Sequence, residues 1–369
     1  MRSFFIALIS IYTLMHVYVF WRIATIPFVT RNVPKTWLVL AGVCLWAIVF
    51  LVRLVGRHGT GTAILALEFF GMNWMAVMFL TFVCLLAIDL VTGFGFFLPR
   101  IAPSLRGWAL AAAGLLSAIA LFQGMRAPVV ENYHVTLSGL PAEMDGSVIV
   151  AMSDLHVGRL RGKDWLAARV AQVRKERPDM VVLLGDYFEG HDRPQEELLA
   201  VMKQLSAPLG VWAVPGNHEN HRGRDLVMPR IEKEGIGVLI NRSVEVQPGF
   251  VLAGVEDLTS RYRSGRKGDL VLKVLKGRPS GATVFLSHTP WQAETAAKAG
   301  AGLMLSGHTH GGQIWPFGYI TRRFYPLLAG QYEVDGMTVI VNRGTGVWGP
   351  LMRLWHPGEI SRITLHSGK

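Results

Sequence analysis

Four long apolar stretches occupy the first third of the chain, and they constrain its architecture more than any other feature. They lie at about residues 4–20, 37–52, 71–90 and 108–122. Each has about 15–21 residues, which is near the length that an α-helix needs to cross the hydrocarbon core of a bilayer. Trp and Tyr residues stand near several of their ends, as is typical of a membrane interface. The pattern predicts about four transmembrane helices.

Neither a soluble helical bundle nor a signal peptide fits these stretches as well. A bundle of buried soluble helices would have to hide four runs that contain very few charged residues. A cleaved signal peptide would explain only the first run. Charged residues make up only 17% of the whole chain, against roughly 25% in an ordinary soluble protein. We therefore predict a transmembrane domain over residues 1–126 and a soluble domain over residues 127–369.

The positive charge of the chain belongs mainly to the apolar part. Of a formal net charge of +11, residues 1–126 carry +7, from nine basic and two acidic residues. Basic residues that flank apolar helices set topology, so we expect no nucleic acid as a partner. The basic residues are divided four against five between the two ends of the helices, which leaves the side of the soluble domain open. We expect a multi-pass protein of the inner cell membrane.

Cysteine usage excludes two further classes of protein. The chain has two cysteines, Cys44 and Cys84, and both lie within the apolar stretches. The sequence therefore excludes a disulfide framework and a metal site built from thiolates.

From about residue 128 the pattern changes to short apolar runs that alternate with polar, helix-like segments. The runs at 147–152, 180–185, 210–216, 282–287 and 302–307 are typical of buried strands. Helices are expected at 164–177, 194–205, 224–234 and 291–299, and the Gly- and Arg-rich stretch 261–268 is expected to be a mobile loop. This alternation predicts an α/β domain with helices on the faces of its sheets.

Each predicted strand ends in residues that bind metals well. The five ends deliver two aspartates, one asparagine and five histidines, in the segments Ser153–His156, Asp186, Asn217–His218, His288 and His308–His310. Ligands of open α/β sheets bind at the carboxyl ends of the strands. In an extended segment, residues two apart point the same way, so Asp154 and His156 can face one site. A single histidine would more often be a core residue, but five such strand ends together indicate a metal centre.

At this point the pattern resembles the calcineurin-like metallophosphoesterase family, in its membrane-attached bacterial branch. The matching blocks are Asp154-x-His156, Gly185-Asp186, Gly216-Asn217-His218-Glu219, His288 and Gly307-His308-x-His310, in that order. The resemblance covers about residues 147–360. It implies a sandwich of two mixed sheets flanked by helices, and it says nothing specific about the four apolar stretches.

The resemblance also implies roles for these residues. Asp154, His156 and His310 would hold one divalent metal ion, while Asn217, His288 and His308 would hold the second. Asp186 would bridge the two ions, and His218 would act as the general acid that protonates the leaving group. Nitrogen and oxygen ligands without thiolate suit Mn, Fe, Zn or Co, and the sequence does not choose among them.

Other candidates rest on weaker patterns. Glu219 would orient His218 or contact substrate, or it is an ordinary acid that closes the loop. Arg343 would contact a substrate phosphate, or it is a structural arginine in a glycine turn. Aromatic segments at 315–319 and 324–328 follow the last predicted ligands, and they either pack as loops or face a lipid.

The sequence therefore predicts a membrane-anchored phosphoester hydrolase with two metal ions: a phosphodiesterase, pyrophosphatase or phosphatase. Attachment to the bilayer favours a phosphorylated or nucleotide-linked lipid as substrate. Three alternatives stay open at this point. The enzyme would act on soluble substrates and be merely anchored, or the domain would be a catalytically silent metal-binding scaffold or sensor. In the third, the four spans would form a lipid-binding or transport module with the phosphoesterase as an accessory.

Overall fold

The computed structural model describes residues 2–55, 61–189, 196–221 and 224–368, and the chain divides into two compact units. The first unit comprises Met1–Met125 and Gly349–Trp355, and the second comprises Arg126–Trp348 and His356–Lys369.

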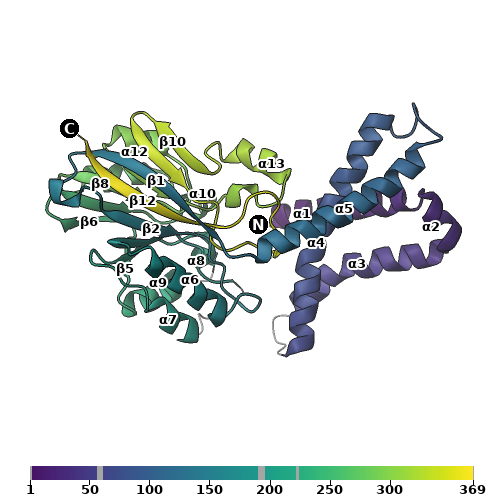
Figure 1. Ribbon diagram of the computed structural model, residues 1–369, viewed down its shortest axis with the longest axis horizontal. Coiled ribbons are helices and arrows are strands. Elements are labelled where there is room, and N and C mark those ends of the chain that lie inside the picture. Colours follow the sequence, from purple (N-terminus) through teal and green to yellow (C-terminus); the bar gives the residue numbers. More distant parts are fainter. Residues whose placement is uncertain (1, 56–60, 190–195, 222–223, 369) are drawn as a thin grey trace. The chain divides into compact units, whose positions relative to one another are not determined.

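The first unit is helical. Its helices are α1 (Arg2–Ile23), α2 (Pro27–Asn32), α3 (Lys35–Val55), α4 (Thr62–Thr92) and α5 (Ala102–Met125) (Figure 1). Four of them, α1, α3, α4 and α5, are long and apolar enough to cross a membrane, which confirms that the four predicted apolar stretches are helices. The third differs from its predicted bounds, because α4 begins at Thr62 and not near residue 71. Glu68, which stands before the apolar stretch in the sequence, therefore lies inside this helix.

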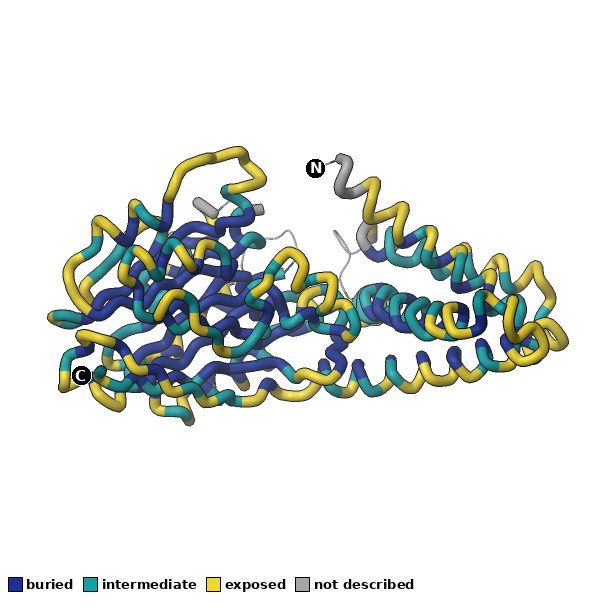
Figure 2. The backbone as a smooth tube through the Cα atoms, turned by 90° about the horizontal axis from the view of Figure 1, so that it is seen from above, coloured by how far each residue is buried: buried dark blue, intermediate teal, exposed yellow. Residues whose placement is uncertain are grey.

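The outer surfaces of these helices are apolar. Leu14, Trp37 and Leu54 are among the large side chains that stay exposed within the unit, at 69%, 66% and 70%. Figure 2 shows long exposed stretches along these helices, whereas the strands of the second unit are largely buried. An α-helix satisfies its own backbone hydrogen bonds, so such a surface is suited to lipid.

A short segment from late in the sequence packs on the last helix of the first unit. The backbone N–H of Arg353 donates to the carbonyl oxygen of Ala120 at 2.9 Å, and that of Trp355 donates to the side chain of Gln123 at 2.8 Å. The predicted boundaries place every residue after 126 in the second domain, whereas Gly349–Trp355 groups with the helices. Nothing in the local pattern of these seven residues marks this return.

The second unit contains two mixed six-stranded sheets. The first sheet has the order β1-β12-β2-β3-β4-β5, and the second has the order β10-β11-β9-β8-β7-β6. The strands of the first sheet are β1 (Val129–Ser138), β2 (Val148–Met152), β3 (Met180–Leu183), β4 (Val211–Ala213), β5 (Gly237–Val238) and β12 (Glu359–Gly368). Those of the second are β6 (Arg242–Gln247), β7 (Phe250–Gly254), β8 (Ala282–Leu286), β9 (Leu303–Ser306), β10 (Gly330–Val334) and β11 (Met337–Val341).

Helices α6 (Lys163–Lys175), α7 (Glu196–Met202) and α9 (Arg224–Lys233) pack on the outer face of the first sheet, and α10 (Leu258–Arg263), α11 (Leu270–Lys276) and α12 (Ala293–Lys298) pack on that of the second. The other helical elements are α8 (Asn217–His221), α13 (Phe317–Phe324) and the 3-10 turns η1 (Ala142–Met144) and η2 (His310–Gly312). Alternate residues of β2 divide between two cores: Val150 packs beneath the helices, and Ile149 packs between the sheets. This two-sided burial explains why the central strands are continuous apolar runs. The predicted fold class is confirmed.

All five predicted strands are present, and each expected helix has a counterpart in α6, α7, α9 or α12. The predicted start of α7, at residues 194–195, lies outside the described part of the chain. Residues 261–268 are only partly a loop, because α10 extends to Arg263. Arg261 and Arg266 both pair with the buried carboxylate of Glu256, at 3.0 and 2.9 Å, which anchors this stretch.

Candidate metal centre

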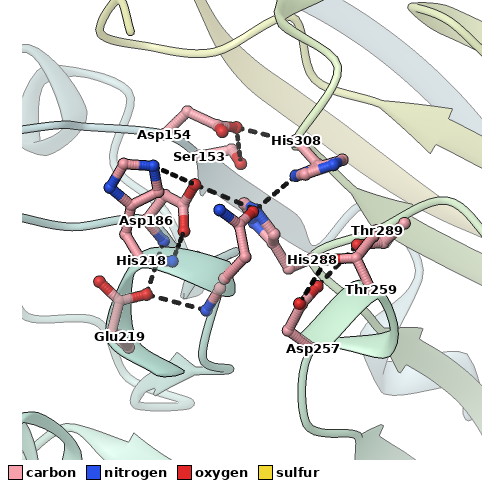
Figure 3. Close-up of polar contacts among 12 residues, drawn as sticks. Ser153, Asp154, Asp186, His218, Glu219, Asp257, Thr259, His288, Thr289 and His308 are labelled. Atoms are coloured by element: carbon pink, nitrogen blue, oxygen red, sulfur yellow. Dashed lines mark hydrogen bonds and ion pairs between the residues drawn. The ribbon is translucent and has the colours of Figure 1, made fainter. Parts of the chain in front are cut away.

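The predicted ligands gather at the carboxyl ends of the parallel strands in both sheets. Strands β2, β3 and β4 run parallel in the first sheet, and β7, β8 and β9 run parallel in the second. The loops that leave β2, β3, β4, β8 and β9 carry the side chains, so segments far apart in sequence meet at one place (Figure 3).

The loops that hold these residues have unusual backbone conformations. Five of the seven predicted ligands have positive φ angles between 45° and 71°: Asp154, His156, Asp186, His308 and His310. Residues other than glycine rarely adopt this left-handed region, and such strain clusters at functional sites. The expectation of an extended segment at Asp154–His156 is therefore wrong. Their side chains still converge, because the left-handed turns redirect them.

Two glycines let the loops approach closely enough to form the site. A Cβ atom on Gly216 would lie 2.2 Å from the Oδ1 of Asp186, and one on Gly307 would lie 1.8 Å from the Oγ of Ser153. Neither distance is possible without moving the loops. The Gly-Asn and Gly-His blocks in the sequence thus reflect a steric requirement as well as ligand chemistry.

The first cluster consists of Asp154, His156 and His310, all of them buried. The Nε2 atoms of the two histidines lie 3.2 Å apart, and the Nε2 of His310 lies 3.2 Å from the Oδ1 of Asp154. The other carboxylate oxygen of Asp154 accepts hydrogen bonds from the Ser153 hydroxyl and the His308 backbone N–H. One oxygen is thus held by the protein, while Oδ1 accepts no hydrogen bond from the described residues.

The second cluster consists of Asp186, His288 and His308, and Asn217 adjoins it. The Nε2 of His288 lies 3.3 Å from the Oδ2 of Asp186, 3.1 Å from the Nδ1 of His308 and 3.2 Å from the Oδ1 of Asn217. Its Nδ1 lies 2.6 Å from the carbonyl oxygen of Leu184. Because Nδ1 must donate a proton to that carbonyl, Nε2 is left to serve as a ligand.

Asp186 lies between the two clusters. Its Oδ2 is 3.3 Å from His288 and 3.8 Å from the Nε2 of His156, so one atom faces histidines of both groups. Its Oδ1 accepts a hydrogen bond of 2.8 Å from the backbone N–H of His218. This is the geometry that a bridging carboxylate needs.

Two residues that the sequence did not reveal orient the predicted ligands. The carboxylate of Glu189 lies 2.8 Å from the Nδ1 of His156, and the hydroxyl of Tyr325 lies 2.9 Å from the Nε2 of His308. Each contact holds one ring nitrogen and turns the other into its cluster, as is usual for histidines that bind metals. Glu189 stands three residues after Asp186, but no spacing rule in the sequence singles out either residue.

The electrostatics of the two clusters favour a cation. Burial alone would raise the pKa of Asp186, but His288 and His218 outweigh it and hold that pKa well below its ordinary value. Burial alone would lower the pKa of His288, but Asp186 outweighs it and raises that pKa well above its ordinary value. Burial and the charge of His288 lower the pKa of His308 to about 4. The carboxylates thus stay ionised and hold protons on neighbouring histidines.

His218 lies at the open edge of the site. Its Nε2 is 3.9 Å from the Oδ2 of Asp186, its Nδ1 is 3.5 Å from Glu189, and its side chain is 19% exposed. Its ring meets that of His156 edge to face, with centroids 4.7 Å apart. His218 can therefore meet a molecule that arrives from solvent.

Glu219 is wholly buried and does not reach the open edge. Its two oxygens accept hydrogen bonds of 2.8–2.9 Å from the backbone N–H groups of Asp186, Tyr187 and Gly216. Burial raises the pKa of this carboxyl. The prediction that Glu219 contacts substrate is wrong, because both oxygens already clamp the two loops that carry Asp186 and Asn217. Local sequence cannot reveal a partner 32 residues away.

Arg343 lies in a glycine-containing turn and has acidic partners. Its guanidinium is 2.5 Å from the carboxylate of Glu131 and 3.4 Å from that of Glu359, and its side chain is 16% exposed. This arrangement fits the structural alternative. Contact of Arg343 with a substrate phosphate stays a prediction.

The donor set fits two metal ions on structural grounds. Paired imidazole nitrogens at 3.1–3.2 Å face one another, and Asp154 keeps a buried oxygen without a hydrogen-bond donor among the described residues. Two ligand atoms of one transition-metal ion lie about 3 Å apart when each bond is about 2.1 Å. Both clusters therefore have the composition and spacing of a metal site.

Two mixed sheets carry, at their strand ends, adjoining His/Asp clusters that could hold metal ions. The family model described as calcineurin-like phosphoesterase matches residues 147–312. An uncharacterized metallophosphoesterase of Aquifex aeolicus is 33% identical over 239 residues, which cover 64% of this chain and 91% of that relative. The chain belongs to the calcineurin-like metallophosphoesterase family, which confirms the resemblance seen in the sequence. Its members are generally metal-dependent hydrolases.

Two further relatives are longer than the matched region. An uncharacterized metallophosphoesterase of Helicobacter pylori is 31% identical over 246 residues, 66% of this chain. A Bos taurus protein called transmembrane protein with metallophosphoesterase domain is 30% identical over 269 residues, 69% of this chain. The matches span 65% and 60% of the length of these two relatives.

Proposed function

We propose that the protein is a membrane-anchored phosphoester hydrolase that depends on two metal ions and acts on a phosphorylated or nucleotide-linked lipid at the membrane surface. The observation that carries this proposal is the position of Asp186, whose Oδ2 faces histidines of both clusters. Metal ions held by these residues would supply electrostatic stabilisation of the charge that develops on the oxygens during a displacement at phosphorus.

Each cluster would hold one ion. Asp154, His156 and His310 would bind the first, and Asn217, His288 and His308 would bind the second, with Asp186 shared. Glu189 and Tyr325 would keep two of the histidine rings in their binding orientation. Ligands of this chemistry accept Mn, Fe, Zn or Co.

His218 would be the general acid. Its Nε2 points toward the clusters and its Nδ1 toward Glu189, so a nearby carboxylate supports the protonated ring. The partial exposure of His218 allows it to reach the leaving-group oxygen of a bound phosphoester and donate a proton. Most of the predicted ligands are buried, so they are less open to such a contact.

The lipid part of the proposal is supported by the four apolar helices. They would confine the hydrolase to a membrane surface, where a lipid substrate has a high effective concentration. A multi-pass location in the inner cell membrane is part of the same proposal.

The hydrolase is tested with the full chain in detergent. After loading with Mn²⁺, we expect about two metal ions per chain by elemental analysis and turnover of bis(p-nitrophenyl) phosphate. Asp335→Asn serves as a control, because this carboxylate is half exposed and pairs with Lys298. Metal binding without turnover of any phosphomonoester or diester would favour the silent scaffold and overturn the hydrolase.

The lipid substrate needs a second assay on the same preparation. Reconstituted protein is given vesicles that contain phosphatidic acid or a nucleotide-linked diacylglycerol, and is compared with water-soluble phosphoesters of the same head group. We expect higher kcat/KM on the lipid. Equal or higher values on the soluble compounds would favour the anchored enzyme for soluble substrates.

A further inference from the structure

Helix α13 carries an apolar stripe whose side chains are largely exposed. Phe317, Ile320 and Phe324 are spaced three and four residues apart, so they share one side of the helix. Their side chains are 45%, 53% and 66% exposed, and no residue of α13 is buried. An amphipathic helix normally buries its apolar side in the core, whereas the apolar side of α13 is exposed.

The contact that holds α13 in place explains this orientation. A Cβ atom on Gly312 would lie 2.2 Å from the Cα of Gly318, so the helix touches η2 through two glycines. Gly318 lies about 100° around the helix from Phe317. The side of α13 that contacts η2 therefore carries a glycine, and the large apolar side chains lie on other sides of the helix, where they stay exposed.

Further aromatic side chains surround the stripe. Trp315 and Tyr319 are 45% and 71% exposed, and Trp348 is 55% exposed. Trp348 is tied to this region by two hydrogen bonds of 3.0 Å with the side chain of Gln313. Arg322 and Arg323 lie in the last turn of α13, and both are exposed. We call Trp315, the residues of α13 and Trp348 the aromatic surface.

We propose that the aromatic surface docks onto the face of a lipid bilayer that contains anionic phospholipid. Exposed Trp, Tyr, Phe and Ile beside arginines are the composition of interfacial helices, where rings enter the head-group region and guanidinium groups meet phosphates. This proposal deepens the proposed function, because it rests on α1, α3, α4 and α5 spanning a membrane.

Covalent connection favours a bilayer over a protein partner. Helix α5 ends at Met125 and β1 begins at Val129, so three residues join a proposed membrane span to the phosphoesterase unit. Trp348 directly precedes Gly349–Trp355, the segment that groups with the membrane helices. Because the phosphoesterase unit is joined to a proposed membrane span, a bilayer is always within reach of it.

Docking of this surface would present lipid head groups to the metal clusters. Tyr325 directly follows α13, and its hydroxyl lies 2.9 Å from the Nε2 of His308. Its ring stacks on Trp291 with centroids 5.6 Å apart. Tyr325, which orients the predicted ligand His308, is therefore the residue next to the docked helix α13.

The docking is tested by fluorescence on the full chain, reconstituted without substrate. Cys44 and Cys84 are replaced by alanine, and an environment-sensitive NBD probe is attached to Ile320→Cys. Leu226→Cys is the matched control, because Leu226 of α9 is 54% exposed but lies outside the aromatic surface. Vesicles contain phosphatidylcholine with about 30% phosphatidylglycerol and spin-labelled lipid.

We expect the probe at position 320 to be quenched by spin-labelled lipid at least about twofold more than the probe at 226, and to be shielded from iodide. Arg322→Glu with Arg323→Glu should reduce the quenching, as should pure phosphatidylcholine. Equal quenching at both positions would overturn the proposal. Shielding from iodide without lipid quenching would also overturn it, because protein would then cover the surface.

These readings are independent of turnover. An inactive chain whose position 320 is quenched would refute the hydrolase and leave the docking intact. An active chain whose probe at position 320 stays in water would refute the docking and leave the hydrolase intact.

Discussion

The two units each bury an aspartate among cationic or potentially cationic groups, but they neutralise its charge differently. In the helical unit, Asp89 is fully buried and lies 2.5 Å from Arg22 and 2.9 Å from Arg106, with the hydroxyl of Tyr18 at 2.6 Å. In the phosphoesterase unit, the Oδ1 of Asp154 faces only imidazole nitrogen and accepts no hydrogen bond from the described residues.

The difference shows what each cluster is built for. Arginine is charged at any relevant pH, so the cluster around Asp89 is complete within the chain and joins α1, α4 and α5. Histidine is charged only when it is protonated, so the clusters around Asp154 and Asp186 are neutralised either by protons or by metal ions. The first arrangement is suited to stabilising a fold, and the second is suited to binding a cation. The following predictions test this contrast, from the largest expected effect to the smallest.

Asp186→Ala should abolish activity, by more than about 10⁴-fold, because the variant removes the carboxylate shared by both ions. Metal content should fall with activity, as measured by elemental analysis on the purified full chain. The Asp335→Asn control should keep both. Two ions at full occupancy in Asp186→Ala would contradict the bridging role.

His218→Ala should keep both ions and lower kcat by about 10²–10⁴-fold, the range for a general acid. The loss should be much smaller for p-nitrophenyl esters, whose leaving group needs no proton. His366→Ala is a suitable control, since this histidine is 42% exposed on β12. An equal loss for good and poor leaving groups would exclude His218 as the acid.

Asp89→Asn should lower the free energy of unfolding of the helical unit by about 3–5 kcal/mol, because two buried arginines lose their counter-charge. The measurement is an SDS titration followed by circular dichroism. Metal content should not change. Arg31→Gln, an exposed site on α2, should unfold like the unaltered chain. Unaltered stability of Asp89→Asn would mean that the cluster is not a structural lock.

Glu189→Gln should weaken metal binding or activity by about 10–100-fold, the usual effect of losing a carboxylate that orients a ligating histidine. Metal titration of the full chain measures it. Tyr325→Phe tests the corresponding contact on His308. If neither variant changes affinity or kcat, these contacts do not position the ligands.

Metal affinity should fall as the pH falls, by about tenfold per pH unit for each proton displaced. The pKa of His288 is raised, so the metal-free site carries a proton on this ring at neutral pH, and the metal must displace it. The dependence should hold below that raised pKa and level off above it. Calorimetry in buffers of different ionisation enthalpy counts the protons released, and no release would refute the competition.

The parts of the fold that the sequence predicted are those whose signal is local. The spans and the central strands are continuous apolar runs, and burial on both faces is enough to produce such runs in a strand. The edge strands gave a weaker signal. Strand β10 alternates between partly buried and exposed residues, β6 has no fully buried residue, and β5 has only two residues.

The candidate site likewise has features that the sequence predicted and features that it did not. All seven predicted ligands lie at strand ends and meet in space, because the carboxyl ends of parallel strands share one edge. The split of His308 and His310 between the two clusters depends on left-handed turns. Such turns come from long-range packing, in which Gly307 approaches Ser153 and Glu219 clamps the loop at Asp186.

The sequence by itself determined the four apolar helices, the α/β half and the residue types of the candidate metal site, because helix length, strand periodicity and ligand chemistry are properties of short segments. Only the tertiary structure decided which residues orient those ligands, that Glu219 is a clamp, that Gly349–Trp355 packs on α5, and that the apolar side of α13 is exposed. Each of these depends on contacts between residues far apart in the chain, or on the choice of which helix face meets the protein, and neither is encoded in any one segment.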